Sequence, residues 1–300
     1  MVHEMKKIFG KSMEEWKEKF SNLDTLLASG GQPDSVGGVI IGTFEDEQGQ
    51  KWTAKEFGGR MDNALEQALN YVTPLGGFVA SIPQIVAGRI KADFENEIWT
   101  KYHDGLTEEL AGKTEAGNEI MIEVHGGGIW TPERMRKAYA DKLVNGAGRL
   151  TEKEFMDIAN GKLPDAVEIP HWHYSEFVKK ESKDLPIRYA VITDFKKVKN
   201  LTNGLQPWAD LYNNPLIILR AGGVEQAHTY LDRAKKRHSN YNNYGCWHQF
   251  SSIDTNIPQG RLVFLGNDDD GFNGDYGLNF SNGRFVGVAP EAHNARKIKL

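Results

Sequence analysis

Three consecutive glycines follow a histidine within the stretch EIMIEVHGGGIWTPERM, residues 119–135. Glycine leaves backbone N–H groups uncovered, and such groups can hold a developing oxyanion or a bound anion. A good N-cap residue, Thr131, then opens a helical segment whose free N–H groups also favour an anion. The sequence predicts anion binding at Gly126, Gly127, Gly128 and Thr131, and at a second glycine corner, Gly222 and Gly223. The alternative is that these glycines only allow sharp turns.

The segment His125-Gly126-Gly127-Gly128 resembles the oxyanion loop of lipases and esterases. That resemblance implies a serine nucleophile in a G-x-S-x-G turn, and the chain contains no such pentapeptide. Neither glycine corner carries a Walker A motif or a G-x-G-x-x-G fingerprint. The lipase interpretation therefore fails, and a bound anion of another kind stays open.

The single cysteine, Cys246, lies beside a tryptophan and a histidine in NYGCWHQF, residues 243–250. A thiolate is a strong nucleophile, and a neighbouring histidine lowers the pKa of a thiol. The sequence thus predicts Cys246, His248 and His125 as catalytic candidates. Gly-Cys-Trp resembles the surroundings of the papain nucleophile, but papain-like enzymes place that cysteine near the mature N-terminus. The alternative is a buried thiol that fills space in the core.

The segment IPHWHYSEF, residues 169–177, carries two candidate metal ligands, His171 and His173. In an extended chain both rings leave the same face, and Glu176 adds a carboxylate. The pattern resembles the first cupin motif, although its glycine and glutamate spacing depart from that motif. The sequence therefore predicts a divalent metal ion at His171, His173 and Glu176, with loop histidines beside Trp172 as the alternative.

The composition is that of an ordinary globular protein with an acidic balance. The 300 residues carry 36 Lys and Arg against 41 Asp and Glu, a net charge of −5, and a pI near 6.0. Nucleic-acid binding requires clustered basic residues, so it is disfavoured. One cysteine excludes an intramolecular disulfide and indicates a reducing compartment. The N-terminus has no signal-peptide pattern and no apolar run is long enough for a membrane span, so we expect a cytoplasmic protein.

Hydrophobic periodicity and turn residues predict an α+β or α/β chain with a mixed sheet. Helices are expected over 11–28, 60–72, from Ser81, from Thr131, from the capping box Thr151/Glu154, and over 222–238. Strands are expected over 39–44, 51–54, 119–124, 185–193, 214–220 and 261–266, with a final hairpin turning at Asn282-Gly283. The segments at 120–139 and 215–234 share a strand–glycine–helix plan that suggests a distant repeat.

The helices concentrate in the first half of the chain and the β structure at its C-terminal end. We therefore expect a helix-rich α/β lobe over 1–160 and a β-rich lobe with one central helix over 161–300, or a single domain.

Two functions are compatible with these patterns, and the sequence favours the first, with the second as the alternative. The first is a cytoplasmic enzyme, a hydrolase or transferase, with a histidine-containing cleft between the glycine corners. The second is a non-catalytic assembly or protein-binding protein, in which the seven Trp and ten Tyr of the chain would make contacts. The sequence leaves the partner open between a small molecule and a protein, and it leaves homo-oligomerisation open.

Overall fold

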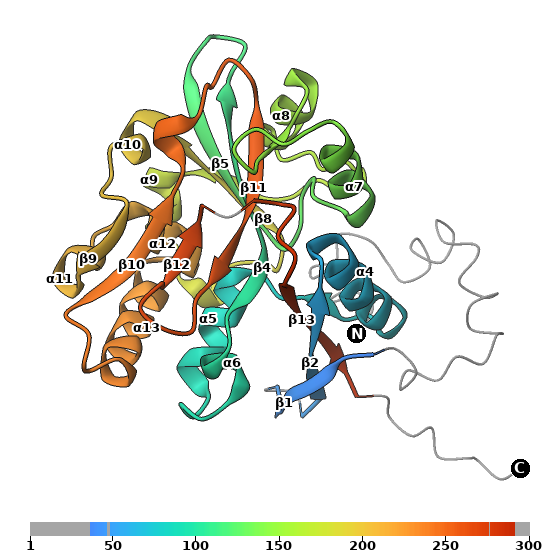
Figure 1. The fold of residues 1–300 in the computed structure, drawn as a ribbon, viewed down its shortest axis with the longest axis vertical. Helices are drawn as coiled ribbons and strands as arrows, with labels where there is room; N and C mark the ends of the chain where they lie inside the picture. Colours follow the sequence, from blue (N-terminus) through green and yellow to red (C-terminus); the bar gives the residue numbers. More distant parts are fainter. Residues whose placement is uncertain (1–36, 47–48, 276, 292–300) are drawn as a thin grey trace, which may run out of the picture.

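Two β-sheets flanked by helices make up the fold (Figure 1). The structure is a computed structural model, and it describes residues 37–46, 49–275 and 277–291. The expected α+β class with mixed sheets is confirmed. The predicted helix over 11–28 lies outside the described residues.

The smaller sheet joins the two ends of the described chain. Its order is β1-β2-β13-β3 and all its pairs are antiparallel. The strands are β1 (Val39–Glu45), β2 (Lys51–Gly59), β3 (Phe78–Val79) and β13 (Gly283–Pro290). One face is covered by α4 (Met61–Val72), which buries Ala64, Leu65 and Ala68 against Phe57 and Phe285. The C-terminal strand therefore lies beside the hairpin near the N-terminal end, as Figure 1 shows.

The larger sheet has nine strands, ordered β7-β8-β5-β4-β11-β12-β10-β9, with β6 also paired to β11. The pairs β7/β8 and β10/β12 are parallel and the others antiparallel. The strands are β4 (His103–Lys113), β5 (Glu119–His125), β6 (Gly148–Arg149), β7 (His171–His173), β8 (Tyr189–Asp194), β9 (Gly204–Pro207), β10 (Asn243–His248), β11 (Gln259–Leu265) and β12 (Phe272–Gly274). Its strands come from both sides of residue 160, so the two expected lobes share one sheet.

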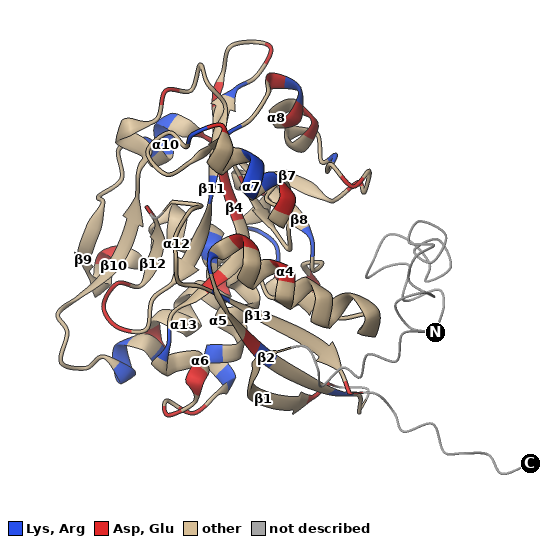
Figure 2. Cartoon of the chain, turned by 45° about the vertical axis from the view of Figure 1, so that its right-hand side comes forward, with Lys and Arg blue, Asp and Glu red and all other residues tan. Residues whose placement is uncertain are grey.

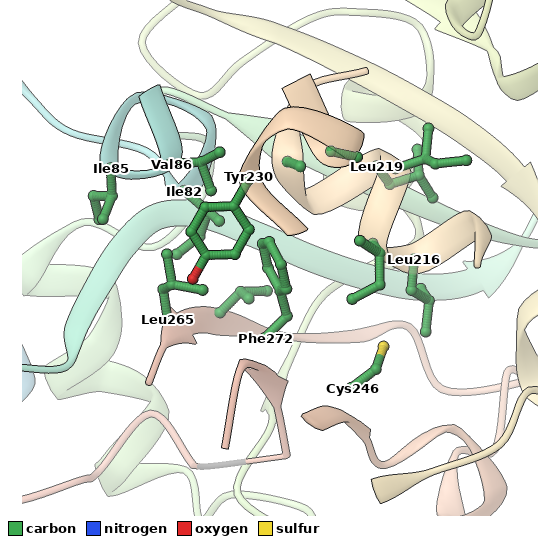
Figure 3. Close-up of a cluster of buried hydrophobic side chains, with 14 of the residues drawn as sticks. Ile82, Ile85, Val86, Leu216, Leu219, Tyr230, Cys246, Leu265 and Phe272 are labelled. Atoms are coloured by element: carbon green, nitrogen blue, oxygen red, sulfur yellow. The ribbon is translucent and has the colours of Figure 1, made fainter. Parts of the chain in front are cut away.

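Helices on the two sides of this sheet form two separate apolar cores. The α-helices are α5 (Ile82–Lys91), α6 (Glu97–Thr100), α7 (Pro132–Ala140), α8 (Glu152–Ala159), α9 (Tyr174–Phe177), α10 (Phe195–Lys199), α11 (Trp208–Leu211), α12 (Pro215–Ala221) and α13 (Val224–Arg237). Single 3-10 turns span Thr73–Leu75, Ser182–Asp184 and Phe250–Ser252. Figure 3 shows the first core, in which α5, α12 and α13 pack on the inner face of the C-terminal strands. The second core lies under α4, α7 and α8.

Helix caps read from the sequence are confirmed. Ser81 and Thr151 each form a capping box, with Gln84 and Glu154 respectively, and Thr131 caps α7 by accepting the Arg134 N–H at 3.2 Å. These signals are local, so tertiary packing changes them little.

Three predictions about elements are wrong. Residues 214–220 form helix α12 rather than a strand, because a helix buried on all sides also reads as an unbroken apolar run. The proposed repeat fails with it, since its second copy is helix–glycine–helix. Asn282-Gly283 does not turn a hairpin: β13 begins at Gly283 and pairs with β2 and β3 instead.

Candidate functional site

The strands β9 to β12 present one face to the helices and the other face outward. Cys246, Phe272 and Leu265 point inward and are fully buried in the core shown in Figure 3. Trp247 pairs with Asn273, and Asn273 pairs with Phe264. Because paired residues share a face and successive residues alternate, Trp247, Asn273 and Phe264 lie on the outward face.

Glycines on two neighbouring strands make room for the Trp247 indole on this outward face. A Cβ at Gly245 would lie 2.5 Å from Trp247 Nε1, and a Cβ at Gly204 would lie 3.3 Å from its Cζ3. The indole therefore lies across the backbones of β10 and β9 and keeps part of its surface exposed. Next to Gly245 in the register is Leu205, which is 45% exposed.

An aromatic cluster continues the outward face beyond β11. The ring of Tyr102 lies 6.0 Å from Phe264 and 6.4 Å from Phe280, both edge to face. The Arg284 guanidinium lies 5.1 Å from the centre of the Tyr102 ring, and the Tyr102 hydroxyl donates to the Asn282 carbonyl. Burial raises the pKa of Tyr102, so its hydroxyl is neutral.

Two polar loops border these aromatics. Residues 239–243 read Ser-Asn-Tyr-Asn-Asn and are all exposed, with Tyr241 at 41%. The neighbouring loop carries Asp268, Asp269 and Asp270. This second loop packs closely against β10, because a Cβ at Gly245 would lie 2.1 Å from the Asp270 carbonyl oxygen. Tyr, Ser, Asn and Gly are the residues that antibody loops use for adaptable protein contacts.

On the inward face, the same strands contact the buried guanidinium of Arg220, which lies in the last turn of α12. Its Nε and Nη2 lie 2.7 Å from Glu109 Oε1, and its Nη1 donates to the Phe272 carbonyl at 3.2 Å. Nη1 also lies 3.8 Å from Cys246 Sγ. Arg220 therefore ties β12 and β10 to β4 in the middle of the sheet. The sequence did not single out Arg220 or Glu109, because α12 was taken for a strand.

The three predicted catalytic residues are buried and only two of them are neighbours. Cys246 and His248 share the inward face of β10, whereas β4, β11 and β12 separate His125 on β5 from them. Burial raises the pKa of the Cys246 thiol to about 11, and burial lowers the pKa of His248 to about 4 and of His125 to about 3. These environments favour a neutral thiol and neutral imidazoles, so they do not support a thiolate nucleophile.

At the first glycine corner, backbone N–H groups bind a side chain of the same protein, the carboxylate of Glu108. The N–H groups of Gly128, Ile129 and Trp130 each donate to the Glu108 carboxylate at 2.9 Å. A Cβ at Gly128 would lie 2.4 Å from Glu108 Oε2, so glycine is required for this close approach. The N–H groups of Gly126 and Gly127 donate to the Leu106 carbonyl. Burial raises the pKa of Glu108, and the three N–H donors oppose that rise.

The second glycine corner joins two helices. The N–H groups of Gly222 and Gly223 donate to the carbonyls of Leu219 and Ile218, at 3.0 and 2.9 Å. Both glycines have positive φ, 85° and 118°, which lets α12 end and α13 begin at once. Anion binding at Gly222, Gly223 and Thr131 stays a prediction.

The predicted metal residues lie on the edge strand β7 and the short helix that follows. His171 and His173 are exposed and leave one face of β7, while Glu176 accepts the His173 N–H at 3.3 Å. Within residues 37–46, 49–275 and 277–291, no group of three or more His, Cys, Asp or Glu side chains is placed to hold a metal ion. The metal prediction is therefore not supported.

Comparison with known proteins gives one informative similarity. Neither a family model nor a curated protein sequence matches the chain. A solved structure described as "Accommodation of massive sequence variation in Nanoarchaeota by the C-type lectin fold" is 27% identical. The alignment covers 78% of this chain and 97% of that one, with a TM-score of 0.61. Among the described residues, no helix is long and apolar enough to cross a membrane. The chain is similar in fold to a protein built on the C-type lectin fold.

Proposed function

We propose that this chain is a non-catalytic binding protein that takes a protein ligand on the outward face of β9 to β12. The observation that carries the proposal is the separation of the two faces. Leu205, Trp247 and Phe264 point outward, whereas Cys246, Leu265 and Phe272 on the same strands pack inward. Exposed aromatic side chains with a polar rim are typical of protein interfaces.

A protein ligand fits this face better than a small molecule does. Small-molecule sites are concave, whereas this face is a sheet surface bordered by polar loops. Two cavities in the described part of the chain lie elsewhere. One, of about 350 Å³, is lined by α5 and α13 residues, and the other, of about 100 Å³, is lined by α8 and the segment after it.

The similar structure supports the same proposal. Its description joins the C-type lectin fold to massive sequence variation. In this chain Leu205 on the outward face and residues 239–243 in the loop that leads into β10 are exposed, so they can change with little effect on the core. We propose that this face determines which partner is bound.

The hydrolase or transferase alternative has less support, because Cys246, His248 and His125 are buried. Figure 2 shows Lys and Arg together with Asp and Glu on helices such as α8. The low expectation for nucleic-acid binding stays a prediction. Cytoplasmic location and homo-oligomerisation stay predictions.

Affinity capture with matched variants tests the proposal. The wild-type chain, a Leu205→Ser/Tyr241→Ser variant and a control Lys153→Ser variant on α8 are immobilised and exposed to the same labelled lysate. We expect a discrete protein to bind the wild type and the control and to be lost from the double variant. Equal capture by all three folded chains would refute binding at this face.

A further inference from the structure

A cluster of polar side chains lies buried on the inward face of the other half of the large sheet. It contains Glu123 and His125 on β5, Tyr189 and Thr193 on β8, and Glu109 on β4. The register pairs His125 with Tyr189, Glu123 with Glu109, and Met121 with Thr193, so these side chains share one face. None of the five is more than 4% exposed.

Most polar atoms of this cluster have no hydrogen-bond partner in the described protein. The unpartnered atoms are both carboxyl oxygens of Glu123, His125 Nε2, Tyr189 Oη and Thr193 Oγ1. The distance from Glu123 Oε1 to His125 Nε2 is 3.7 Å, which is too long for a direct hydrogen bond. Buried polar groups in folded proteins are almost always satisfied, by protein or by ordered water.

The adjacent cation does not complete the cluster. Arg220 from α12 directs Nε and Nη2 to Glu109, and Nη1 to the Phe272 carbonyl. Arg220 is ion-paired with Glu109, and its charge also lowers the pKa of Glu123, although by less than burial and the Glu109 charge raise it. Burial first, and then the Glu109 charge, raises the pKa of Glu123 well above its usual value, while burial lowers the pKa of His125 to about 3.

The unpartnered groups are thus a carboxyl group, an imidazole and two hydroxyls. Together they offer both hydrogen-bond donors and acceptors. A buried water molecule needs two to four polar partners, and this cluster supplies five atoms from two neighbouring strands.

We propose that this cluster is an internal hydration site, in which bound water links the Glu123 side chain to Tyr189 and His125. The water satisfies groups that strand pairing alone leaves unpaired. The site lies next to Arg220, which holds the strands of the outward face, but the inference does not depend on the proposed function.

A high-resolution crystal structure of the full chain tests this directly. We expect ordered water within hydrogen-bond distance of Glu123 and of either Tyr189 or His125. A direct Glu123–Tyr189 hydrogen bond with no water, or a Glu123–Arg220 ion pair, would overturn the proposal.

Infrared spectroscopy gives a second readout. We expect a carbonyl band of a protonated carboxylic acid at neutral pH that disappears in Glu123→Gln and persists in the surface control Asp157→Asn. Exchange into heavy water must shift this band. If Glu123→Gln does not fold, Tyr189→Phe serves instead: the account requires the band to move, and an unmoved band contradicts it.

Discussion

The two faces of the C-terminal strands differ in what their side chains contact. Along β10, Tyr244, Cys246 and His248 pack inward, where Arg220 ties the strands to Glu109. Asn243 and Trp247 point outward and are bordered by exposed loop residues. Strand β10 thus has three buried residues that pack in the core (Tyr244, Cys246 and His248) and two more exposed residues on the outward face (Asn243 and Trp247). Under the proposed function, binding and folding are therefore expected to respond to changes at different residues of this region.

The largest effect is expected from removing the inward cation. Arg220→Ala leaves the buried Glu109 charge unpaired and frees the Phe272 carbonyl, so the free energy of unfolding should fall by about 3–5 kcal/mol. Urea unfolding measures this loss. The matched control is Arg149→Ala, whose side chain is exposed and which should change stability by less than about 0.5 kcal/mol. Equal effects of the two changes would contradict the assigned role of Arg220.

The second largest expected effect is a pH dependence of the free energy of unfolding, caused by the buried thiol of Cys246. Burial raises the pKa of Cys246 from 9.0 to about 11, so the unfolded chain loses this proton first as the pH rises. The stability contributed by the neutral thiol is complete below pH 9.0 and declines by about 1.4 kcal/mol per pH unit up to the folded pKa. Unfolding of the wild type and of Cys246→Ala should therefore diverge above pH 9.0. Parallel pH profiles would mean that the thiol is not held neutral.

A smaller loss of stability is expected when a side chain is added at Gly245, a glycine in close contact with a neighbouring loop. Gly245→Ala places a Cβ 2.1 Å from the Asp270 carbonyl oxygen, which should cost about 1–3 kcal/mol. The control is Gly42→Ala in β1, where nothing lies within 4 Å of the new Cβ. Thermal unfolding should separate the two variants, and a stable Gly245→Ala would show that β10 and the loop at Asp270 are not in close contact.

The smallest stability change is expected on the outward face itself. Tyr241→Ser should alter the free energy of unfolding by less than about 0.5 kcal/mol, because Tyr241 is 41% exposed. Partner binding should nevertheless weaken. A large loss of stability would show instead that Tyr241 is needed for folding.

Local signals in the sequence predicted much of the fold but little of the site. The caps at Ser81, Thr131 and Thr151 were readable because each depends on a few adjacent residues. Helix α12 was missed although Asn214 caps it and Pro215 opens it, signals that outweigh its apolar run.

Contacts between segments that are far apart in the chain could not be predicted from the sequence. The glycines at 126–128 indicated an anion, yet the anion is Glu108 on the preceding strand, which the β4–β5 register brings to them. The outward face likewise combines β9, β10, β11 and β12, whose spatial order differs from their order in the chain. Only the three-dimensional pairing shows that Trp247 and Phe264 share a surface.

The most direct test randomises the exposed positions Leu205, Tyr241, Asn242 and Asn243 together and measures, for each displayed variant, folding and partner binding. A parallel library randomises the buried positions Tyr244, Cys246, Leu265 and Phe272. The account predicts that most variants of the first library fold and lose the wild-type partner, whereas most of the second do not fold. Similar folded fractions in the two libraries, or a partner retained throughout the first, would contradict it.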